Sequence, residues 1–213
     1  MAKAPKAGMV KTRLAACLPQ PAIIELYGCF LEDTLALAQS LEGVETAIMS
    51  PACDIEALSL VTGNGVCVVG QTGEGLGAAL TSVFAHFAAA GRRRIIAFNS
   101  DSPHLPASTL LMAFDVLSSC DLVIGPTNDG GYYLVGAKTS HPGLFDGSPL
   151  GTANALEALL ARARDLDLSV RFTDSFYDVD VAADLSRLAD ELLLAPERAP
   201  RTARWLVDWA ASQ

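Results

Sequence analysis

The sequence predicts an α/β protein in which a Rossmann-like, mostly parallel sheet lies between two layers of helices. Segments with apolar residues at helical spacing alternate along the chain with short strands that are apolar on both faces, as in a sheet covered on both sides. The 213 residues are 51% apolar and 18% charged, which is enough to bury a sizeable core. Because neither a repeat nor a low-complexity linker divides the chain, we expect one domain over residues 1–213.

Hydrophobic periodicity predicts the order of the elements. Helical spacing predicts helices over 20–41, 54–61, 76–91, 106–118, 152–166 and 181–195, and a C-terminal helical tail within 196–213. Short apolar runs predict strands over 44–50, 66–70, 93–100, 121–125, 132–136 and 169–173. Since ligands of such sheets bind beyond the carboxyl ends of the strands, the loops of interest are 71–77, 99–105, 126–131 and 174–180.

Charge is distributed unevenly along the chain. The formal net charge is −9, yet the first 24 residues carry Lys3, Lys6, Lys11 and Arg13 and no acid. The remaining 11 basic and 24 acidic residues make the rest of the surface acidic, which repels nucleic-acid backbones and disfavours a DNA- or RNA-binding module. A local basic loop fits a small phosphorylated ligand; the alternative is a solvated lysine-rich end.

The composition favours a cytoplasmic protein without a membrane span. The five cysteines are odd in number and widely spaced, without a CxxC pair, which favours reduced thiols over a disulfide framework or a zinc site. Apolar runs stay below the roughly 18 to 20 residues that span a bilayer. No apolar stretch follows the N-terminal charges, as it would in a secretory signal.

The N-terminal stretch KAPKAGMVKTRL has the composition of a phosphate-binding loop. Gly8 permits close approach of the backbone, Lys11 supplies a point charge, Arg13 can bind two phosphate oxygens at once, and Lys3 adds a further cation. The Walker pattern is absent. In this architecture such a loop follows a first, central strand. Only two residues precede it here, so we expect either that this strand is truncated or that the loop is tethered differently.

Two aspartates follow predicted strands and are candidate metal ligands. Asp101 lies just past the strand 93–100, and Asp180 lies between the last predicted strand and the helix that begins near Val181. Carboxylates there suit Mg²⁺, which takes one or two carboxylates together with ligand phosphates. Each aspartate has an alternative role as a turn or helix-cap residue. Asp178 precedes Asp180 by two residues, so in extended chain the two side chains point the same way.

Two glycine-rich turns add candidate contacts. GPTNDGGYYLVG joins two strands through Asp129, Gly130 and Gly131; this is an ordinary turn signal, although the paired glycines would let a ligand approach and Asp129 could contact a sugar or acceptor hydroxyl. GQTGEGLG places Gly75 and Gly77 at the start of a helix whose N-terminus could receive an anion or a base edge. As a dinucleotide fingerprint the second turn is weak.

The histidines suggest little chemistry. His86 is expected to be structural within its helix, and His104 to lie at the surface, with acid–base work beside Asp101 as the alternative. Neither a Ser-His-Asp nor a Cys-His arrangement is evident in the sequence.

Taken in order, the stretches AKAPKAGMVKTRL, SDSPHLP, GPTNDGGYYLVG, PLGT and YDVDVAADL resemble a bacterial family of glycosyltransferase-A-like proteins of largely unassigned activity. That family is similar to 2-phospholactate guanylyltransferase and, more distantly, to molybdenum cofactor guanylyltransferase. The resemblance covers residues 2 to about 190. It implies the nucleotide-diphospho-sugar transferase fold, a nucleotide bound along the carboxyl edge of the sheet, and Mg²⁺ or Mn²⁺.

The resemblance also implies roles for individual residues. The implied roles are phosphate contacts by Lys11 and Arg13, metal binding by Asp101 and Asp180, a nucleoside near Gly75 and Gly77, and a second substrate near Asp129, Gly130 and Gly131. The sequence departs from the family in two of these stretches. Val181-Ala182 replaces Thr-Pro, which removes a favourable helix cap and a first-turn proline. Leu150-Gly151 replaces a Trp, so a different acceptor specificity is expected.

Three functions fit these residues. The one we expect is glycosyl transfer from a nucleotide-diphospho-sugar, in which the metal and the basic loop stabilise the departing diphosphate and Asp129 is a candidate base. The second is nucleotidyl transfer, in which an acceptor phosphate attacks the α-phosphate of an NTP and pyrophosphate leaves. The third is a non-catalytic nucleotide-binding protein.

Overall fold

A computed structural model describes residues 1–62, 66–146 and 154–212. The helices are α1 Gln20–Gln39, α2 Ile55–Thr62, α3 Gly75–Ala89, α4 Ala107–Val116, α5 Ala155–Asp165, α6 Ala182–Leu194 and α7 Pro200–Ala211. The strands are β1 Ala47–Ser50, β2 Cys67–Gly70, β3 Ile95–Phe98, β4 Leu122–Pro126, β5 Tyr132–Ala137 and β6 Val170–Phe172. These elements follow the predicted order; the expected start of the helix at 152 lies outside the described residues.

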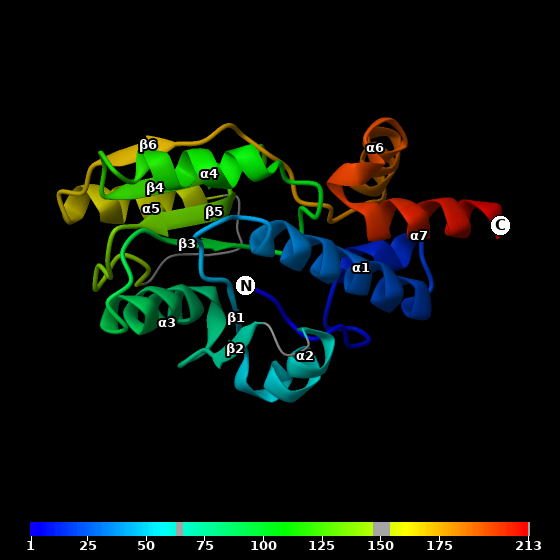
Figure 1. Ribbon diagram of the computed structural model, residues 1–213, viewed down its shortest axis with the longest axis horizontal. Helices are drawn as coiled ribbons and strands as arrows, with labels where there is room; N and C mark the ends of the chain where they lie inside the picture. The colour runs from blue at the N-terminus through cyan, green and yellow to red at the C-terminus, as the bar shows by residue number, and fades with distance from the viewer. Residues whose placement is uncertain (63–65, 147–153, 213) are drawn as a thin grey trace.

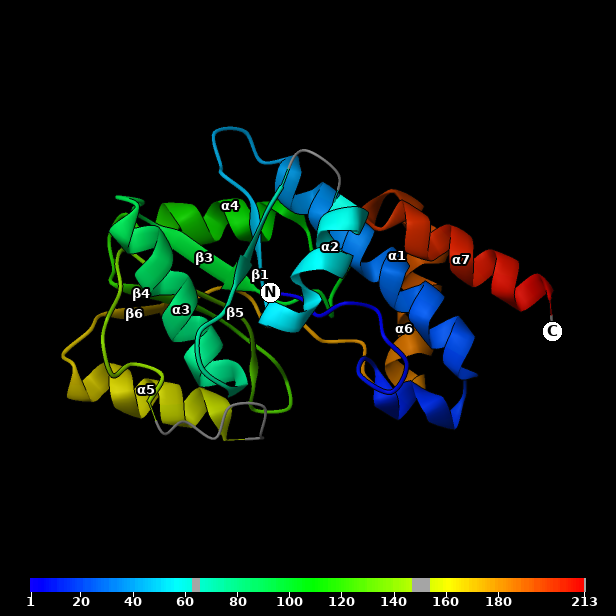
Figure 2. The same ribbon diagram turned by 90° about the horizontal axis from the view of Figure 1, so that it is seen from below.

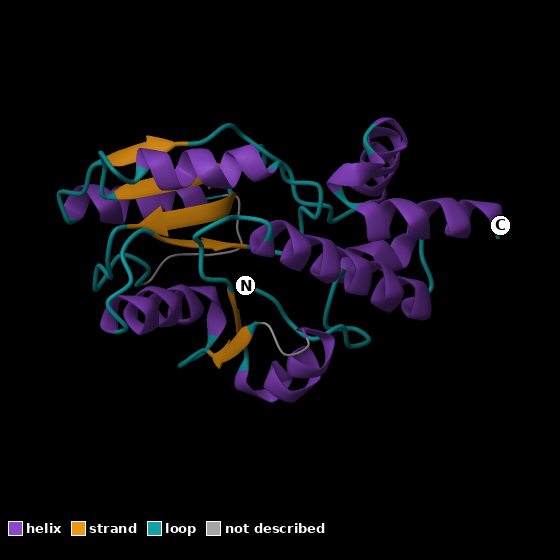
Figure 3. Cartoon of the chain, viewed as in Figure 1, coloured by secondary structure: helices purple, strands orange, loops and turns teal. Residues whose placement is uncertain are grey.

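The strands form two separate sheets, and the two-stranded sheet lies below the four-stranded one in the view of Figure 1. One holds β3, β5, β4 and β6 in that order, and the other pairs β1 with β2. The β1–β2 and β4–β6 pairs are parallel, as the apolar character of both strand faces predicts. Figure 3 shows the strands gathered in one half of the molecule, with helices on either side.

Strand β5 corrects the expectation of a mostly parallel sheet. It runs antiparallel to both of its neighbours, β3 and β4. The reason is the length of the connection: residues 127–131 are all that separate β4 from β5, whereas a parallel crossover needs a dozen residues or more. The turn closes with Thr127 N–H donating to the carbonyl of Gly131 (3.1 Å). The spacing of the two strands in the sequence was sufficient to predict a hairpin.

Helices cover both faces of the four-stranded sheet, which confirms the three-layer arrangement. Side chains of α3 and α5, such as Phe84 and Leu159, pack on one face with Ile124 of β4. Leu110 of α4 and Leu117, which directly follows α4, pack on the other face. Figure 2 shows α4 and α5 on opposite sides of the strands.

A separate helical cluster forms the other half of the molecule. Helices α1, α6 and α7 bury apolar side chains against one another and against the N-terminal loop (Figures 1 and 3). The predicted helical tail is α7, whose Trp205 and Trp209 stack with ring centroids 5.4 Å apart. The first turn of α7 is fixed to α1, because the buried carboxylate of Asp33 accepts from the N–H groups of Arg201 and Thr202. Among the described residues, no helix is both long and apolar enough to cross a membrane.

The predicted surface position of His104 is wrong. Its side chain is fully buried, with the ring 4.8 Å from those of both Phe176 and Tyr177, and neither ring nitrogen makes a hydrogen bond. The Nε2 atom lies 3.5 Å from Glu191, but that carboxylate is already paired with Arg187. Burial, reinforced by nearby arginines, lowers the pKa of His104 to about 3, so the imidazole is neutral and structural.

The buried histidine makes stability depend on pH. The folded protein cannot readily protonate His104, whereas the unfolded chain protonates it near pH 6.5, so the free energy of unfolding falls as the pH drops below that value. As the pH falls from 7 to 4.5, His104 should lower the free energy of unfolding by about 2 kcal/mol. We expect His104→Leu to lose less stability than the wild type over that interval in urea denaturation. His86→Leu, at an exposed position of α3, is the control; parallel curves for wild type and His104→Leu would contradict this account.

Candidate functional site

The basic N-terminal loop is held in place by its own lysines. Lys6 Nζ pairs with Asp54 at 2.5 Å and donates to the carbonyl of Cys53, and Ala4 N–H donates to the other oxygen of Asp54. Gly8 has φ +70°, a conformation that favours glycine, and its N–H donates to Gln20. The loop is therefore tethered to the start of α2 and to α1.

Lys11 lies between the two predicted metal ligands. Its Nζ is 2.5 Å from Asp101 Oδ1 and 2.9 Å from Asp180 Oδ1, although these residues are far apart in the sequence. The lysine side chain is only 3% exposed, whereas the carboxylates are 34% and 44% exposed. Burial acts to lower the pKa of Lys11, but the two carboxylates outweigh it and the net pKa is raised. Two carboxylate oxygens thus converge on one cationic atom.

The backbone of Lys11 shows that this arrangement has a conformational cost. Lys11 has φ 44° and ψ 41°, a left-handed backbone conformation that residues other than glycine rarely adopt. The residue immediately precedes the 3-10 helix Thr12–Ala16, whose Leu14 is fully buried in the core shared with α1 and α6. The ion pairs and the burial of Leu14 stabilise this turn.

A direct backbone bond joins the loops that carry the two aspartates. The N–H of Val179 donates to the carbonyl of Asp101 at 2.9 Å, which links the loop after β3 to the loop before α6. The alternative role of Asp180 as a helix cap is not realised, because its side chain points to Lys11 and makes no capping bond. Asp184 instead accepts from the N–H groups of Asp180 and Val181.

Asp178 supports the site from beneath. The side-chain amide of Asn99 donates to both carboxylate oxygens of Asp178, at 3.0 and 2.9 Å. The Ser102 hydroxyl donates to Oδ1 of the same carboxylate at 2.9 Å. Burial, with the negative charge of Asp101 nearby, raises the pKa of Asp178 to about 6. Sequence reasoning did not identify Asn99 or Ser102, although both lie in the NSDS string around Asp101 that could have drawn attention to them.

The turn that carries Asp129 interacts electrostatically with Arg13 of the N-terminal segment. Asp129 Oδ1 accepts from the Thr127 hydroxyl at 2.5 Å and from the N–H of Gly131 at 3.2 Å, so the carboxylate stabilises its own turn. The Thr127 bond chiefly, and the positive charge of Arg13 to a smaller extent, lower the pKa of Asp129. A side chain at Gly131 would collide with Thr127, and Gly130 has φ +88°. The turn role is therefore observed, and an acceptor role stays a prediction.

The remaining candidates lie on the N-terminal segment and at the start of α3. Arg13 and Lys3 are exposed on the N-terminal segment, and the backbone N–H of Lys3 donates to the hydroxyl of Tyr27 at 3.4 Å. Gly75, with φ +81°, and Gly77 begin α3 just beyond β2, whose carboxyl end lies beside that of β1. The structure thus brings Lys11, Asp101 and Asp180 into contact, whereas no contact joins Gly75 or Gly77 to them among the described residues.

The donor set fits a hard divalent cation that takes part of its shell from a ligand. Two carboxylate oxygens already contact the Lys11 ammonium, whose positive charge occupies the place that a divalent metal ion would take. Among the residues that the structure describes, no group of three or more His, Cys, Asp or Glu side chains gathers as a metal site. Mg²⁺ commonly binds through one or two carboxylates and completes its shell with phosphate oxygens and water, so two aspartates suffice.

The fold places the chain among nucleotide-diphospho-sugar transferase-like proteins. It superposes with a TM-score of 0.91 on a protein from Desulfovibrio desulfuricans G20 named a "putative nucleotide-diphospho-sugar transferase"; the two are 28% identical, over 99% of this chain and 93% of that one. The chain belongs to the DUF2064 family, described as uncharacterized protein conserved in bacteria, whose profile matches residues 34–152. No curated protein matches the chain.

Two mycobacterial structures share the fold more distantly. Rv0371c from Mycobacterium tuberculosis H37Rv has a TM-score of 0.53, and its homolog from Mycobacterium sp. strain JC1 has one of 0.51. Both are 20% identical to this chain; they cover 89% and 80% of it, and are themselves covered to 93% and 84%. None of these three structures is named as a guanylyltransferase, so that resemblance stays a prediction.

Removing the ammonium should destabilise the site. In Lys11→Met the carboxylates of Asp101 and Asp180 face each other without a cation, so we expect a loss of about 1–3 kcal/mol, moderated by their partial exposure to water. Urea denaturation at neutral pH and low ionic strength measures this loss. Lys3→Met, at an exposed position of the same loop, should leave stability nearly unchanged. Equal stability of Lys11→Met and the wild type would contradict the inferred role of the ammonium.

Proposed function

We propose that this protein is a metal-dependent glycosyltransferase that uses a nucleotide-diphospho-sugar as donor. The observation that carries the proposal is the convergence of Asp101 and Asp180 on one cationic atom, within a basic loop at the carboxyl ends of the strands. In open α/β sheets this edge is where ligands bind. The likeness to the Desulfovibrio protein supports the same class of donor.

In this proposal the chain's own residues divide the work on the diphosphate. Asp101 and Asp180 hold Mg²⁺ or Mn²⁺, which supplies charge neutralisation and orientation of the diphosphate as it departs. Arg13, exposed beside the Asp129 turn, binds phosphate oxygens in pairs. Asp178, held by Asn99 and Ser102, keeps the loop of Asp180 in position.

Lys11 has two successive partners in this proposal. Without ligand, its ammonium neutralises the two carboxylates and preserves their spacing. If a nucleotide diphosphate bound with its cation, the two carboxylates would hold the divalent ion, and the Lys11 ammonium would contact a phosphate oxygen. One flexible side chain thereby keeps the aspartates preorganised in the free protein and neutralises charge in the complex.

The acceptor side of the site is proposed to be the turn at Asp129. Its lowered pKa keeps the carboxylate ionised, as a hydrogen-bond acceptor for a sugar or acceptor hydroxyl requires. Gly130 and Gly131 of the same turn are proposed to lie near the second substrate. Gly75 and Gly77, at the N-terminus of α3, are proposed to lie near the nucleoside.

A thermal-shift panel tests the proposal. NDP-sugars, NDPs and NTPs are each added with and without Mg²⁺ or Mn²⁺ to the wild type, to Asp101→Asn and to Asp190→Asn, whose aspartate is exposed on α6. A ligand at a hundred times its Kd should stabilise the protein by about 2.7 kcal/mol. We expect metal-dependent stabilisation by an NDP-sugar that Asp101→Asn loses and Asp190→Asn keeps.

Other outcomes of the panel would redirect the assignment. Stabilisation by NTPs but not by NDP-sugars, with release of pyrophosphate, would favour nucleotidyl transfer. Nucleotide binding that ignores metal and gives no turnover would favour a binding protein. Absence of any nucleotide-dependent shift would contradict the proposal.

The exchange of partners by Lys11 has its own measurement. Because Lys11→Met leaves the two carboxylates without a counter-ion, Mg²⁺ alone should raise its midpoint of thermal unfolding more than that of the wild type. Adding Asp180→Asn to Lys11→Met should abolish the gain. An equal response of Lys11→Met and the wild type to Mg²⁺ would show that the lysine and the metal do not share a site.

A further inference from the structure

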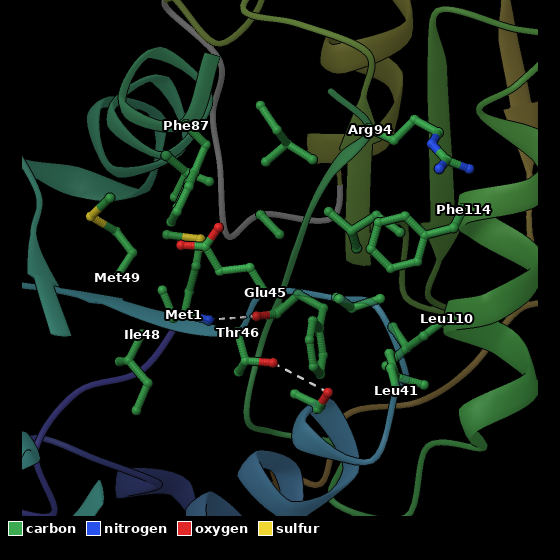
Figure 4. A pocket seen from close by; sticks show the side chains of 18 of the residues that line it. Met1, Leu41, Glu45, Thr46, Ile48, Met49, Phe87, Arg94, Leu110 and Phe114 are labelled. Carbon is green, nitrogen blue, oxygen red and sulfur yellow. Dashed lines mark hydrogen bonds between the residues drawn. The ribbon is translucent and has the colours of Figure 1, made fainter. Parts of the chain in front are cut away.

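The loop that carries Asp101 borders a cavity and is attached to the helical cluster. The cavity, of about 630 Å³, lies between β1 and β3, and Ser100 is among the residues that line it (Figure 4). The hydroxyls of Ser100 and of Tyr27 in α1 share a hydrogen bond at 3.0 Å. Three residues beyond Asp101, the carbonyl of His104 accepts from the guanidinium of Arg198. The loop is thus attached to helical segments both before and after Asp101.

The Arg198 contact has a well-defined geometry. Arg198 lies in the 3-10 helix Pro196–Arg198 between α6 and α7, and its Nε and Nη2 atoms donate to the carbonyl oxygen of His104 at 3.1 and 2.7 Å. The ring nitrogens of His104 have no hydrogen-bond partner, so the carbonyl is the polar attachment of this residue to the helices. A guanidinium presents its donors in a fixed planar fork, and this contact therefore restricts the carbonyl more than one flexible donor would.

A second arginine contacts the loop that carries Asp180. The guanidinium carbon of Arg187, on α6, lies 3.8 Å from the centre of the Tyr177 ring, which is a cation–π contact. Tyr177 precedes Asp180 by three residues, just as His104 follows Asp101 by three. Each aspartate loop is therefore contacted by one arginine from the segment that comprises α6 and the 3-10 helix after it.

Glu191 joins the two arginines. Its Oε1 accepts from Arg187 Nε at 2.9 Å, and its Oε2 lies 3.7 Å from Arg198 Nη1. The side chains of Glu191 and Arg198 are only 29% and 30% exposed, so water screens their attraction less than it would at an open surface. One carboxylate thus links the guanidinium groups that contact the two loops.

Hydrogen bonds also connect the two loops to each other. The Ser102 hydroxyl donates to the carbonyl of Tyr177 at 2.8 Å, and the N–H of Val179 donates to the carbonyl of Asp101 at 2.9 Å. These bonds hold the loops side by side, whereas the arginines attach both loops to packed helices. Side chains of a site are held precisely when such outer contacts fix them to a rigid support. The spacing of the two carboxylates that contact Lys11 therefore depends on both sets of contacts.

We propose that Arg198 is a positioning residue, which fixes Asp101 relative to Asp180 through its contact with the loop carbonyl. Without the guanidinium, the two carboxylates should pair less closely with Lys11 and bind a divalent cation more weakly. The effect on the cation rests on the proposed function of the protein. The effect on Lys11 does not, because the ion pairs are present in the structure itself.

Acetylation of lysines tests the effect on the ion pairs. The wild type, Arg198→Met and Arg198→Lys are treated briefly with acetic anhydride at neutral pH, and mass spectrometry measures modification of Lys11 relative to the exposed Lys3. We expect Arg198→Met to raise the relative rate at least about fivefold, because looser pairing lowers the pKa of the Lys11 ammonium and exposes it. Arg198→Lys keeps one cationic donor and should raise the rate less. Arg204→Met, at an exposed arginine of α7, is the matched control and should match the wild type.

Binding of Mn²⁺ tests the consequence for the site. Free Mn²⁺ is followed by electron paramagnetic resonance during titration of Lys11→Met, alone and combined with Arg198→Met or with Arg204→Met. We expect Arg198→Met to raise the Kd for Mn²⁺ about tenfold and Arg204→Met to leave it unchanged, since a small displacement of a ligating group is costly. Urea denaturation shows that each variant is fully folded, so a loss of global stability alone would change neither the acetylation rate nor the Kd.

The outcomes separate the positioning role from the proposed function. The positioning role is overturned if folded Arg198→Met leaves the acetylation of Lys11 unchanged, or leaves the Mn²⁺ affinity of Lys11→Met unchanged. If Arg198→Met does not fold, Arg198→Lys decides by the same criteria. If Lys11→Met itself binds no Mn²⁺, the metal site of the proposed function is contradicted, and the acetylation rates alone decide the role of Arg198.

Discussion

The Lys11 ammonium between Asp101 and Asp180 is the interaction on which the candidate site depends. It joins the N-terminal loop, the loop after β3 and the loop before α6, which are separated by most of the chain. With the lysine side chain almost fully buried, the charges attract each other through a medium less screening than water, and the attraction outweighs the cost of desolvating the ammonium. The two ion pairs thus fix the spacing of the carboxylates of Asp101 and Asp180.

The neighbouring contacts show how the fold supports this ion pair. The Val179–Asp101 backbone bond fixes one loop against the other, and the Asp178 carboxylate is held from below by Asn99. Asp178 and Asp180, two residues apart, therefore have different partners and different roles. The half-buried Asp178 accepts from neutral donors and has a raised pKa, whereas Asp180 pairs with the Lys11 ammonium. Preorganisation of this kind is what electrostatic stabilisation of a leaving group requires.

The N-terminal segment connects the strand edges to the candidate site. Residues 1–2 contact the carboxyl ends of β1 and β3, and the loop that follows brings Lys11 to the two aspartates. The Lys6–Asp54 ion pair holds the same loop beside the start of α2.

The sequence by itself determined the order of the elements, the α/β class, and the placement of Lys11, Asp101 and Asp180 on loops at one edge of the sheet, because these follow from periodicity and local turn chemistry. The five-residue length of the connection between β4 and β5 was also enough to predict that β5 runs antiparallel to β4, although the apolar pattern of the strands did not indicate it. Only the tertiary structure decided that His104 is buried, that Asp180 faces Lys11 and does not cap α6, and that β1 and β3 face each other across a cavity. These outcomes rest on contacts between distant segments, whose desolvation and pairing no local pattern encodes.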